Sequence, residues 1–185
     1  MHVVDYVFFL GWIVFWAYWL IAALGVKRGQ GQYVRFATAR LAIVLIVVIL
    51  LRLGVFRAHG SAADNHNLAV AGVGLALFVL GLALAVWARL YLGRNWGMPM
   101  TQKAEPELVR TGPYRHVRHP IYSGIILAMV GTAVAISFTW LIAVIALGGY
   151  FVYSAHVEER NMTRLFPDTY PEYKHSTKML IPFVF

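Results

Sequence analysis

The chain has 185 residues, of which 60% are hydrophobic, with a mean hydropathy of +0.66 and a net charge of +8. The hydrophobic residues form long runs with few charges, which excludes an ordinary soluble domain and predicts an all-α, polytopic integral membrane protein. Basic residues stand at the ends of these runs, where they suit anionic lipids rather than nucleic acid, and the absence of cysteine excludes disulfides and thiolate metal sites.

Two hydrophobic runs in the first part of the chain predict transmembrane helices at residues 3–26 and 36–56. The first run has neither a basic segment before it nor a small-residue cleavage site after it, so we expect a retained span rather than a signal peptide. A polar, turn-like loop at 57–67 follows the second run. We therefore expect an N-terminal pair of transmembrane helices, residues 1–67, followed by a core domain at 68–185.

Three further runs predict transmembrane helices at 68–92, 120–136 and 138–157, which makes five in all. Almost no chain separates the last two, so they are expected to form a tight antiparallel hairpin. An amphipathic tail at 158–185 is expected either to lie on the membrane surface or to cover the polar connection at 93–119. Close helix contact is predicted by small residues spaced four apart, namely Gly72 with Ala76, Gly81 with Ala85, Gly124 with Ala128, and Gly131 with Ala135.

The distribution of positive charge predicts the orientation. With five spans, 14 of the 16 Lys and Arg residues fall on one side of the membrane. The positive-inside rule then predicts that the 93–119 connection and the C-terminal tail are cytoplasmic, with the N-terminus outside. We expect the membrane to be a bacterial or archaeal cytoplasmic membrane.

A dense polar segment at 107–124 separates the third and fourth runs and carries Arg110, Arg115, His116, Arg118 and His119. Pro120 has no N–H and suits the first turn of a helix, so the N–H groups that follow are expected to favour an anionic group. A neutral His119 just before this helix, with Tyr122 one turn in, offers directed hydrogen bonds. For Arg115 and His116, a topology signal with a helix cap is an equally good explanation.

Two adjacent carboxylates, Glu158 and Glu159, stand at the inner end of the fifth run. Carboxylates beside lipid are costly unless they have partners. Adjacent helical residues project about 100° apart, so at most one of the two is expected to face the interior of the hairpin. A structural role would be an interfacial salt bridge to Arg115 or Arg118, and a functional role would be acceptance of hydrogen bonds from an ammonium or ribose group.

The second half of the chain combines several motifs. Leu-Gly-x-Asn-Trp at 92–96 is followed by Leu-Val-x-x-Gly-Pro-Tyr-x-x-x-Arg-His-Pro-x-Tyr-x-Gly at 108–124, a helical hairpin, the Glu-Glu pair, Tyr170, Tyr173 and a final Ile-Pro-Phe at 181–183. This combination resembles the isoprenylcysteine carboxyl methyltransferase family, part of a wider group of membrane methyltransferases that includes the phospholipid N-methyltransferases.

The resemblance implies a multi-span enzyme that uses S-adenosylmethionine without a soluble Rossmann fold, in a pocket formed by the 93–119 connection, the last hairpin and the tail. In the carboxyl methyltransferases, an Arg four positions before the Glu pair is associated with the substrate carboxylate, and this chain has Ser154 there. Carried over position by position, the family's cofactor contacts fall on Gln102, Glu107, Leu108, Val109, Tyr114, His119, Pro120, Ile121, Tyr122 and Glu158.

The expected acceptor is a small lipophilic molecule that enters from the bilayer, an isoprenylcysteine-type carboxylate or a similar lipid. A carboxylate is already ionised and needs no base, whereas an amine or thiol would need one, for which His156 and Glu159 are the candidate catalytic residues. N-methylation of a phospholipid or amine is the alternative reaction. A non-enzymatic membrane scaffold is a second alternative, and a nicotinamide-dependent reductase a third, although nothing in the sequence indicates a nicotinamide site.

Overall fold

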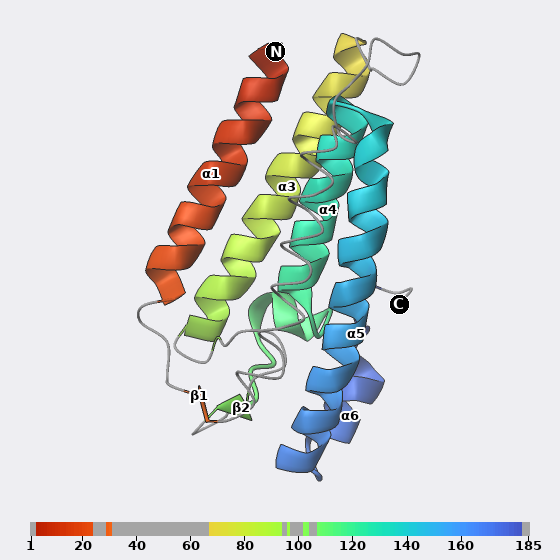
Figure 1. Ribbon diagram of the computed structural model, residues 1–185. Coiled ribbons are helices and arrows are strands. Elements are labelled where there is room, and N and C mark those ends of the chain that lie inside the picture. Colours follow the sequence, from red (N-terminus) through yellow and green to blue (C-terminus); the bar gives the residue numbers. More distant parts are fainter. Residues whose placement is uncertain are drawn as a thin grey trace.

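A computed structural model describes residues 3–23, 29–30, 67–93, 96, 102–103 and 107–182. Within these residues the protein is all-α apart from one two-residue ladder between β1 (Gly29–Gln30) and β2 (Gln102–Lys103). The helices are α1 (Val3–Ala23), α3 (Leu68–Leu92), α4 (Pro120–Ala135), α5 (Leu141–Leu165) and α6 (Tyr170–Ser176), with 3-10 turns η2 (Gly112–Arg115) and η3 (Phe138–Trp140). The four long helices run side by side, and α6 lies beside the end of α5 that extends beyond the bundle (Figure 1).

Three of the described helical segments are long and apolar enough to cross a membrane: α1, α3 and the continuous η3–α5 segment. The fourth, α4, has 16 residues and a length of about 24 Å, less than the roughly 30 Å of a bilayer's hydrocarbon core. The predicted spans at 3–26, 68–92 and 120–136 correspond closely to α1, α3 and α4. The predicted span at 36–56 lies outside the described residues, so a total of five spans stays a prediction, as does the domain boundary at residue 67.

Local capping fixes the ends of α3. The side chain of Asn67 accepts a hydrogen bond from the backbone N–H of Ala69 at 2.9 Å, which satisfies one of the unpaired donors in the first turn. The helix stops at Gly93, whose φ of +50° lies in the left-handed region that favours glycine.

The closest contact in the bundle joins α3 and α4, which run antiparallel, through glycine. A Cβ atom added to Gly81 would lie 2.5 Å from the carbonyl oxygen of Gly124, and one added to Gly74 would lie 2.6 Å from that of Gly131. Backbone therefore meets backbone, as the predicted small-residue pattern requires. At Gly72 an added Cβ would meet nothing within 4 Å among the described residues, so on α3 the contact with α4 runs through Gly74 rather than through the predicted Gly72.

Aromatic side chains pack α1 against α3 and α4. The rings of Phe8 and Phe78 lie 4.6 Å apart, and the indole Nε1 of Trp12 donates a hydrogen bond to Oγ1 of Thr132 at 3.2 Å. Further along α1, the ring of Trp19 lies edge-on to that of Trp96 at 5.7 Å. The last turns of α1 are thereby held beside the end of α3.

The predicted hairpin forms from α4 and α5, which are joined by Ile136, Ser137 and η3. Its second helix continues to Leu165, so the prediction that the helix ends near 157 and that a separate tail begins at 158 was wrong. Within this extension, Glu159 pairs with cations from other segments, as described below.

Candidate active site

Several residues predicted to bind a cofactor come together where residues 107–119, the start of α4 and the extended end of α5 meet, at the end of the bundle next to α6 (Figure 1). Three observations locate this site: a cluster of charged side chains around His119, a group of aromatic rings around Tyr122, and a stretch of tail that runs along residues 116–119.

His119 lies between the two carboxylates. Its Nδ1 is 3.5 Å from Oε2 of Glu158, and its Nε2 is 3.5 Å from Oε1 of Glu159. Glu158 also accepts a hydrogen bond from the hydroxyl of Tyr122. The expectation that at most one of the two carboxylates would face the interior was wrong, because His119 at the start of α4 is placed to reach both.

The two carboxylates differ in burial and in their partners. Glu159 is 2% exposed, and its Oε1 accepts a hydrogen bond from Nε of Arg118 at 2.6 Å, while Nζ of Lys174 lies 2.8 Å from Oε2. The salt bridge to Arg118 that we considered as the structural role therefore forms at Glu159. Glu158 is 28% exposed and contacts His119 and Tyr122, which leaves its carboxylate accessible to a ligand.

The tail covers the polar segment, which was one of the two arrangements expected for it. The backbone N–H of Arg118 donates to the carbonyl of Lys178 at 2.8 Å, and that of His119 donates to the carbonyl of Met179 at 3.0 Å. The Arg118 guanidinium donates to the carbonyl of Thr177. The hydroxyl of Tyr173 in α6 donates to the carbonyl of Tyr114 at 2.6 Å. The tail thus helps to build the site and is not merely adjacent to it.

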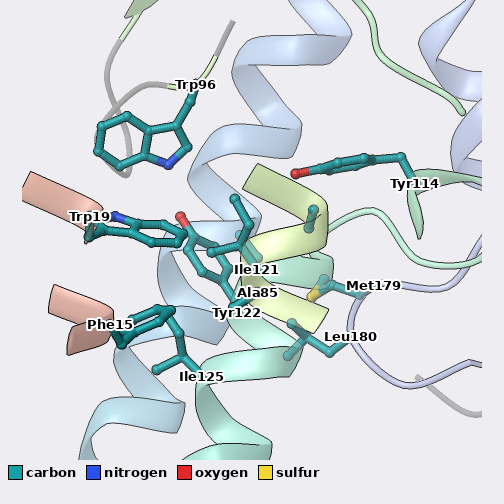
Figure 2. Packing of buried hydrophobic residues seen from close by; sticks show 12 residues of the cluster. Phe15, Trp19, Ala85, Trp96, Tyr114, Ile121, Tyr122, Ile125, Met179 and Leu180 are labelled. Atoms are coloured by element: carbon teal, nitrogen blue, oxygen red, sulfur yellow. The ribbon is translucent and has the colours of Figure 1, made fainter. Parts of the chain in front are cut away.

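Aromatic rings form one wall of the site. The ring of Tyr122 stacks on that of His119, with centroids 5.4 Å apart, and on that of Phe151 from α5, at 4.8 Å. Tyr114 is also buried in this cluster, and Figure 2 shows its hydroxyl directed toward the middle of the group that contains Ile121 and Trp96. Stacked aromatic faces carry negative potential and attract cations.

The pKa of His119 is shifted by its surroundings. Burial lowers it, but hydrogen bonds and charges from Glu158 and Glu159 outweigh that effect and raise the pKa above the ordinary value of 6.5. Burial, with Tyr173 and Glu158 adding to it, raises the pKa of Tyr114 well above 10.0, so its hydroxyl stays protonated.

One buried hydroxyl in this region, Oγ of Ser154, has no hydrogen-bond partner among the described residues. Ser154 is fully buried one turn before Glu158. Buried polar groups are normally paired, so this hydroxyl is suited to receive a group from a ligand.

The remaining predicted residues fall into two groups. Pro120 and Ile121 are buried at the start of α4, and Leu108 and Val109 are half-buried, but Glu107 is exposed. Gln102 pairs with Gln30 through the backbone ladder, and its side chain lies outside the described part of the chain. His156 is exposed, and its Nδ1 lies 2.8 Å from the carbonyl of Val152 one turn earlier in α5, so the described contacts do not bring it to the charged cluster. Its catalytic role stays a prediction.

The sequence reasoning did not single out two residues that belong here. Lys174 and Arg89 entered the sequence analysis only through the count of positive charges that predicts the orientation. In the structure, Lys174 pairs with Glu159, and Arg89 is buried against Trp96. A signal was available for Arg89, because it is the single charged residue in the 25-residue apolar helix α3.

The chain is similar to several known proteins. The chain is 27% identical over 146 residues to a nickel-cobalt-cadmium resistance protein of Alcaligenes xylosoxydans xylosoxydans, covering 77% of this chain and 64% of that protein. It is 27% identical over 119 residues to protein-S-isoprenylcysteine O-methyltransferase B of Arabidopsis thaliana, covering 62% of this chain and 60% of that protein. The chain thus spans less than two thirds of the length of these relatives.

The fold resembles a solved structure of the eukaryotic intramembrane Ras methyltransferase, isoprenylcysteine carboxyl methyltransferase. The TM-score is 0.57 at 20% sequence identity, covering 84% of this chain and 55% of the other. The phospholipid methyltransferase family matches residues 70–169, more than half of the chain and all of α4 and α5. The chain is therefore an integral membrane protein of the phospholipid methyltransferase family.

Proposed function

We propose that this protein is an S-adenosylmethionine-dependent methyltransferase that transfers a methyl group to a lipophilic acceptor in the membrane. The observation that carries the proposal is the convergence of Tyr122, His119 and Glu158 from α4 and α5, with an aromatic wall beside an accessible carboxylate. Family membership supports the type of reaction.

The residues at the site suit the cofactor's chemistry. When bound, S-adenosylmethionine supplies an electrophilic methyl group on a positively charged sulfur. The carboxylate of Glu158 suits an ammonium or a ribose hydroxyl, and the rings of Tyr122 and Phe151 line the site beside it. The start of α4 after Pro120 suits a carboxylate, because the first N–H groups of a helix favour anions.

The chain's own residues would act by positioning and by excluding water. Methyl transfer requires the nucleophile to lie in line with the methyl carbon at about 3 to 3.5 Å. The tail, held over the site by Arg118 and Tyr173, keeps that alignment in a dry environment, where a nucleophile sheds less solvent before it reacts. No described residue has to form a covalent bond in this scheme.

For the acceptor, we propose an isoprenylcysteine-type carboxylate or a similar small lipid, with N-methylation of a phospholipid or amine as the second candidate. A carboxylate needs no base, and the exposed His156 is not placed at the cluster as a base would be. The family's description as phospholipid methyltransferases favours the second candidate. Ser154 offers a buried hydroxyl rather than a charge, so it would hydrogen-bond the acceptor rather than pair with it.

We also propose the topology that the charge distribution predicts, with the site and tail on the cytoplasmic side of a bacterial or archaeal cytoplasmic membrane and the N-terminus outside. Anionic lipids would then surround the basic segment. The lipophilic acceptor would reach the site sideways from the bilayer.

Calorimetric titration of detergent-purified protein with S-adenosylhomocysteine tests the proposal. We expect binding, with affinity lowered by at least about tenfold in Glu158→Gln, because a charge-assisted hydrogen bond is lost, and unchanged in the matched variant Glu172→Gln on the exposed face of α6. If no binding were detected at millimolar ligand, the proposed methyltransferase function would be refuted and a non-enzymatic membrane scaffold would be the remaining explanation. Transfer of a labelled methyl group into a total lipid extract, with mass analysis of the product, then identifies the acceptor.

A further inference from the structure

Arg89 carries the one charge of α3 and is almost completely buried, with 5% of its surface exposed. Burying an ionised group without compensation costs several kcal/mol, so a buried arginine in an apolar helix requires an explanation. Contacts with other parts of the protein account for some of this compensation, but the described residues do not supply all of it.

The structural part is a clamp between two helix ends. Nη1 of Arg89 donates to the carbonyl of Gly93, at the end of α3, and Nη2 donates to that of Ala22, near the end of α1, both at 2.7 Å. The guanidinium carbon lies 4.7 Å from the centre of the Trp96 ring. Helix C-termini carry partial negative charge and an indole face attracts cations, so both contacts stabilise the guanidinium.

These contacts leave both charge and hydrogen-bonding capacity unused. No carboxylate forms a salt bridge with Arg89 among the described residues, and its buried Nε–H has no partner there. The titratable side chains near enough to interact with it are Tyr18 and Tyr114, which carry no charge at neutral pH. A guanidinium has five N–H groups, of which this clamp uses two.

The position of Arg89 connects it to the site. Tyr114 is close enough to interact electrostatically with both Arg89 and Glu158, and its ring belongs to the same buried cluster as Trp96 (Figure 2). A ligand held beside Tyr114 would therefore lie near both a carboxylate and a guanidinium. This arrangement suits a molecule that carries a cationic and an anionic group.

We propose that Arg89 is a ligand-binding residue that receives a carboxylate of the bound molecules through its Nε–H and remaining N–H groups. The carboxylate has two possible sources, the methionyl end of the cofactor or the acceptor. This inference rests on the proposed function, because it assumes that a methyl donor and its acceptor meet beside Tyr114. It assigns the anionic end of one of them to α3, outside the residues that the sequence motifs indicated.

Binding of paired ligands tests the inference in intact, detergent-purified protein. The cofactor pair is S-adenosylhomocysteine and 5′-methylthioadenosine, which lacks the amino-acid end. The acceptor pair is N-acetyl-S-farnesylcysteine, with a free carboxylate, and its amide. The variants are Arg89→Gln, Arg89→Lys and the matched control Arg164→Gln, an exposed arginine in the last turn of α5.

If the cofactor supplies the carboxylate, Arg89→Gln weakens S-adenosylhomocysteine binding by at least about tenfold and leaves 5′-methylthioadenosine unchanged. If the acceptor supplies it, the same loss appears for the farnesylcysteine carboxylate and not for its amide. Arg89→Lys falls between, because an ammonium keeps the charge but not the planar fork. Arg164→Gln changes neither pair.

Unchanged affinities for all four ligands in a folded Arg89→Gln variant would overturn the inference and leave Arg89 as a clamp alone. If that variant does not fold, the wild type decides, because equal affinities within both pairs mean that no carboxylate is recognised. Wild-type protein that binds neither cofactor ligand would instead refute the proposed methyltransferase function.

Discussion

The buried ion cluster around Glu159 makes the most specific prediction about stability. Glu159→Gln removes one charge and little volume, and it leaves the guanidinium of Arg118, whose side chain is 8% exposed, without its carboxylate partner. The same substitution affects the pairing with Lys174, whose side chain is 50% exposed. Arg118 and Lys174, two of the three partners of this carboxylate, therefore differ mainly in burial, which allows their contributions to be separated.

The expected magnitudes follow from that difference. Breaking a buried pair by removing one partner costs about 3 to 5 kcal/mol, and the lower end applies here because the amide oxygen still accepts a hydrogen bond. An exposed pair is worth roughly 0 to 1 kcal/mol, so Lys174→Gln should cost little. For a chain of this size, 1 kcal/mol corresponds to about 2 to 4 °C in Tm, so Glu159→Gln should lower Tm by about 6 to 12 °C.

Unfolding in a fixed detergent, followed by circular dichroism, measures these shifts, and a double-mutant cycle with Arg118→Gln measures the coupling. We expect a coupling of at least about 1.5 kcal/mol between Glu159 and Arg118, and no more than about 0.5 kcal/mol between Glu159 and Lys174. A Lys174→Gln shift as large as that of Glu159→Gln would refute the reasoning, because burial would then not decide the strength of the pair.

Three further predictions concern packing, pH and the base. Gly81→Leu should prevent assembly of α3 on α4, because a Cβ added at Gly81 lies 2.5 Å from the carbonyl oxygen of Gly124. Gly72→Leu should be tolerated, because a Cβ added there meets none of the described residues within 4 Å. Limited proteolysis in detergent compares the two variants. Since the folded pKa of His119 is raised above 6.5, its contribution to stability is complete below pH 6.5 and declines as pH rises through that pKa. His119→Gln should flatten this dependence of Tm on pH, and an unaltered slope would mean that another group titrates. If His156 acts as a base, His156→Ala should leave carboxyl methylation nearly intact but lower amine methylation by roughly 10²-fold. Equal rates of amine methylation in the variant and the wild type would show that His156 is not the base.

The sequence was sufficient to predict helices whose first and last residues are determined by local capping. An apolar run bounded by Asn67 and Gly93 specifies α3, and Pro120 specifies the start of α4, because capping and the missing proline N–H act within one turn. The carboxylate–histidine–tyrosine grouping at the site was also indicated by the motifs, although the upward shift of the His119 pKa was not. That shift depends on two carboxylates 39 and 40 positions later in the chain.

Long-range pairing explains what sequence reasoning missed. The extended part of α5 contains Glu159, whose partners Arg118 and Lys174 come from other segments, and a local pattern does not show such pairing. The choice of Gly74 over Gly72 depends on which face of α3 meets α4, and closely spaced small residues at the start of α3 allow several faces. Arg89 is the single charge in an apolar helix, but its partners are backbone carbonyls and a ring, which the sequence does not identify.

The glycine contact between α3 and α4 also fixes the position of Arg89 relative to the rest of the bundle, so an insertion between this contact and Arg89 would displace the guanidinium. Eight positions, or about 12 Å of helix, separate Gly81 from Arg89. One residue added between them would turn the guanidinium by about 100° around the axis of α3, away from the carbonyl of Ala22 near the end of α1, while the glycine crossing stayed intact. Natural variation in the length of α3 should therefore be confined to the turns before Gly74, on the side away from the charged cluster.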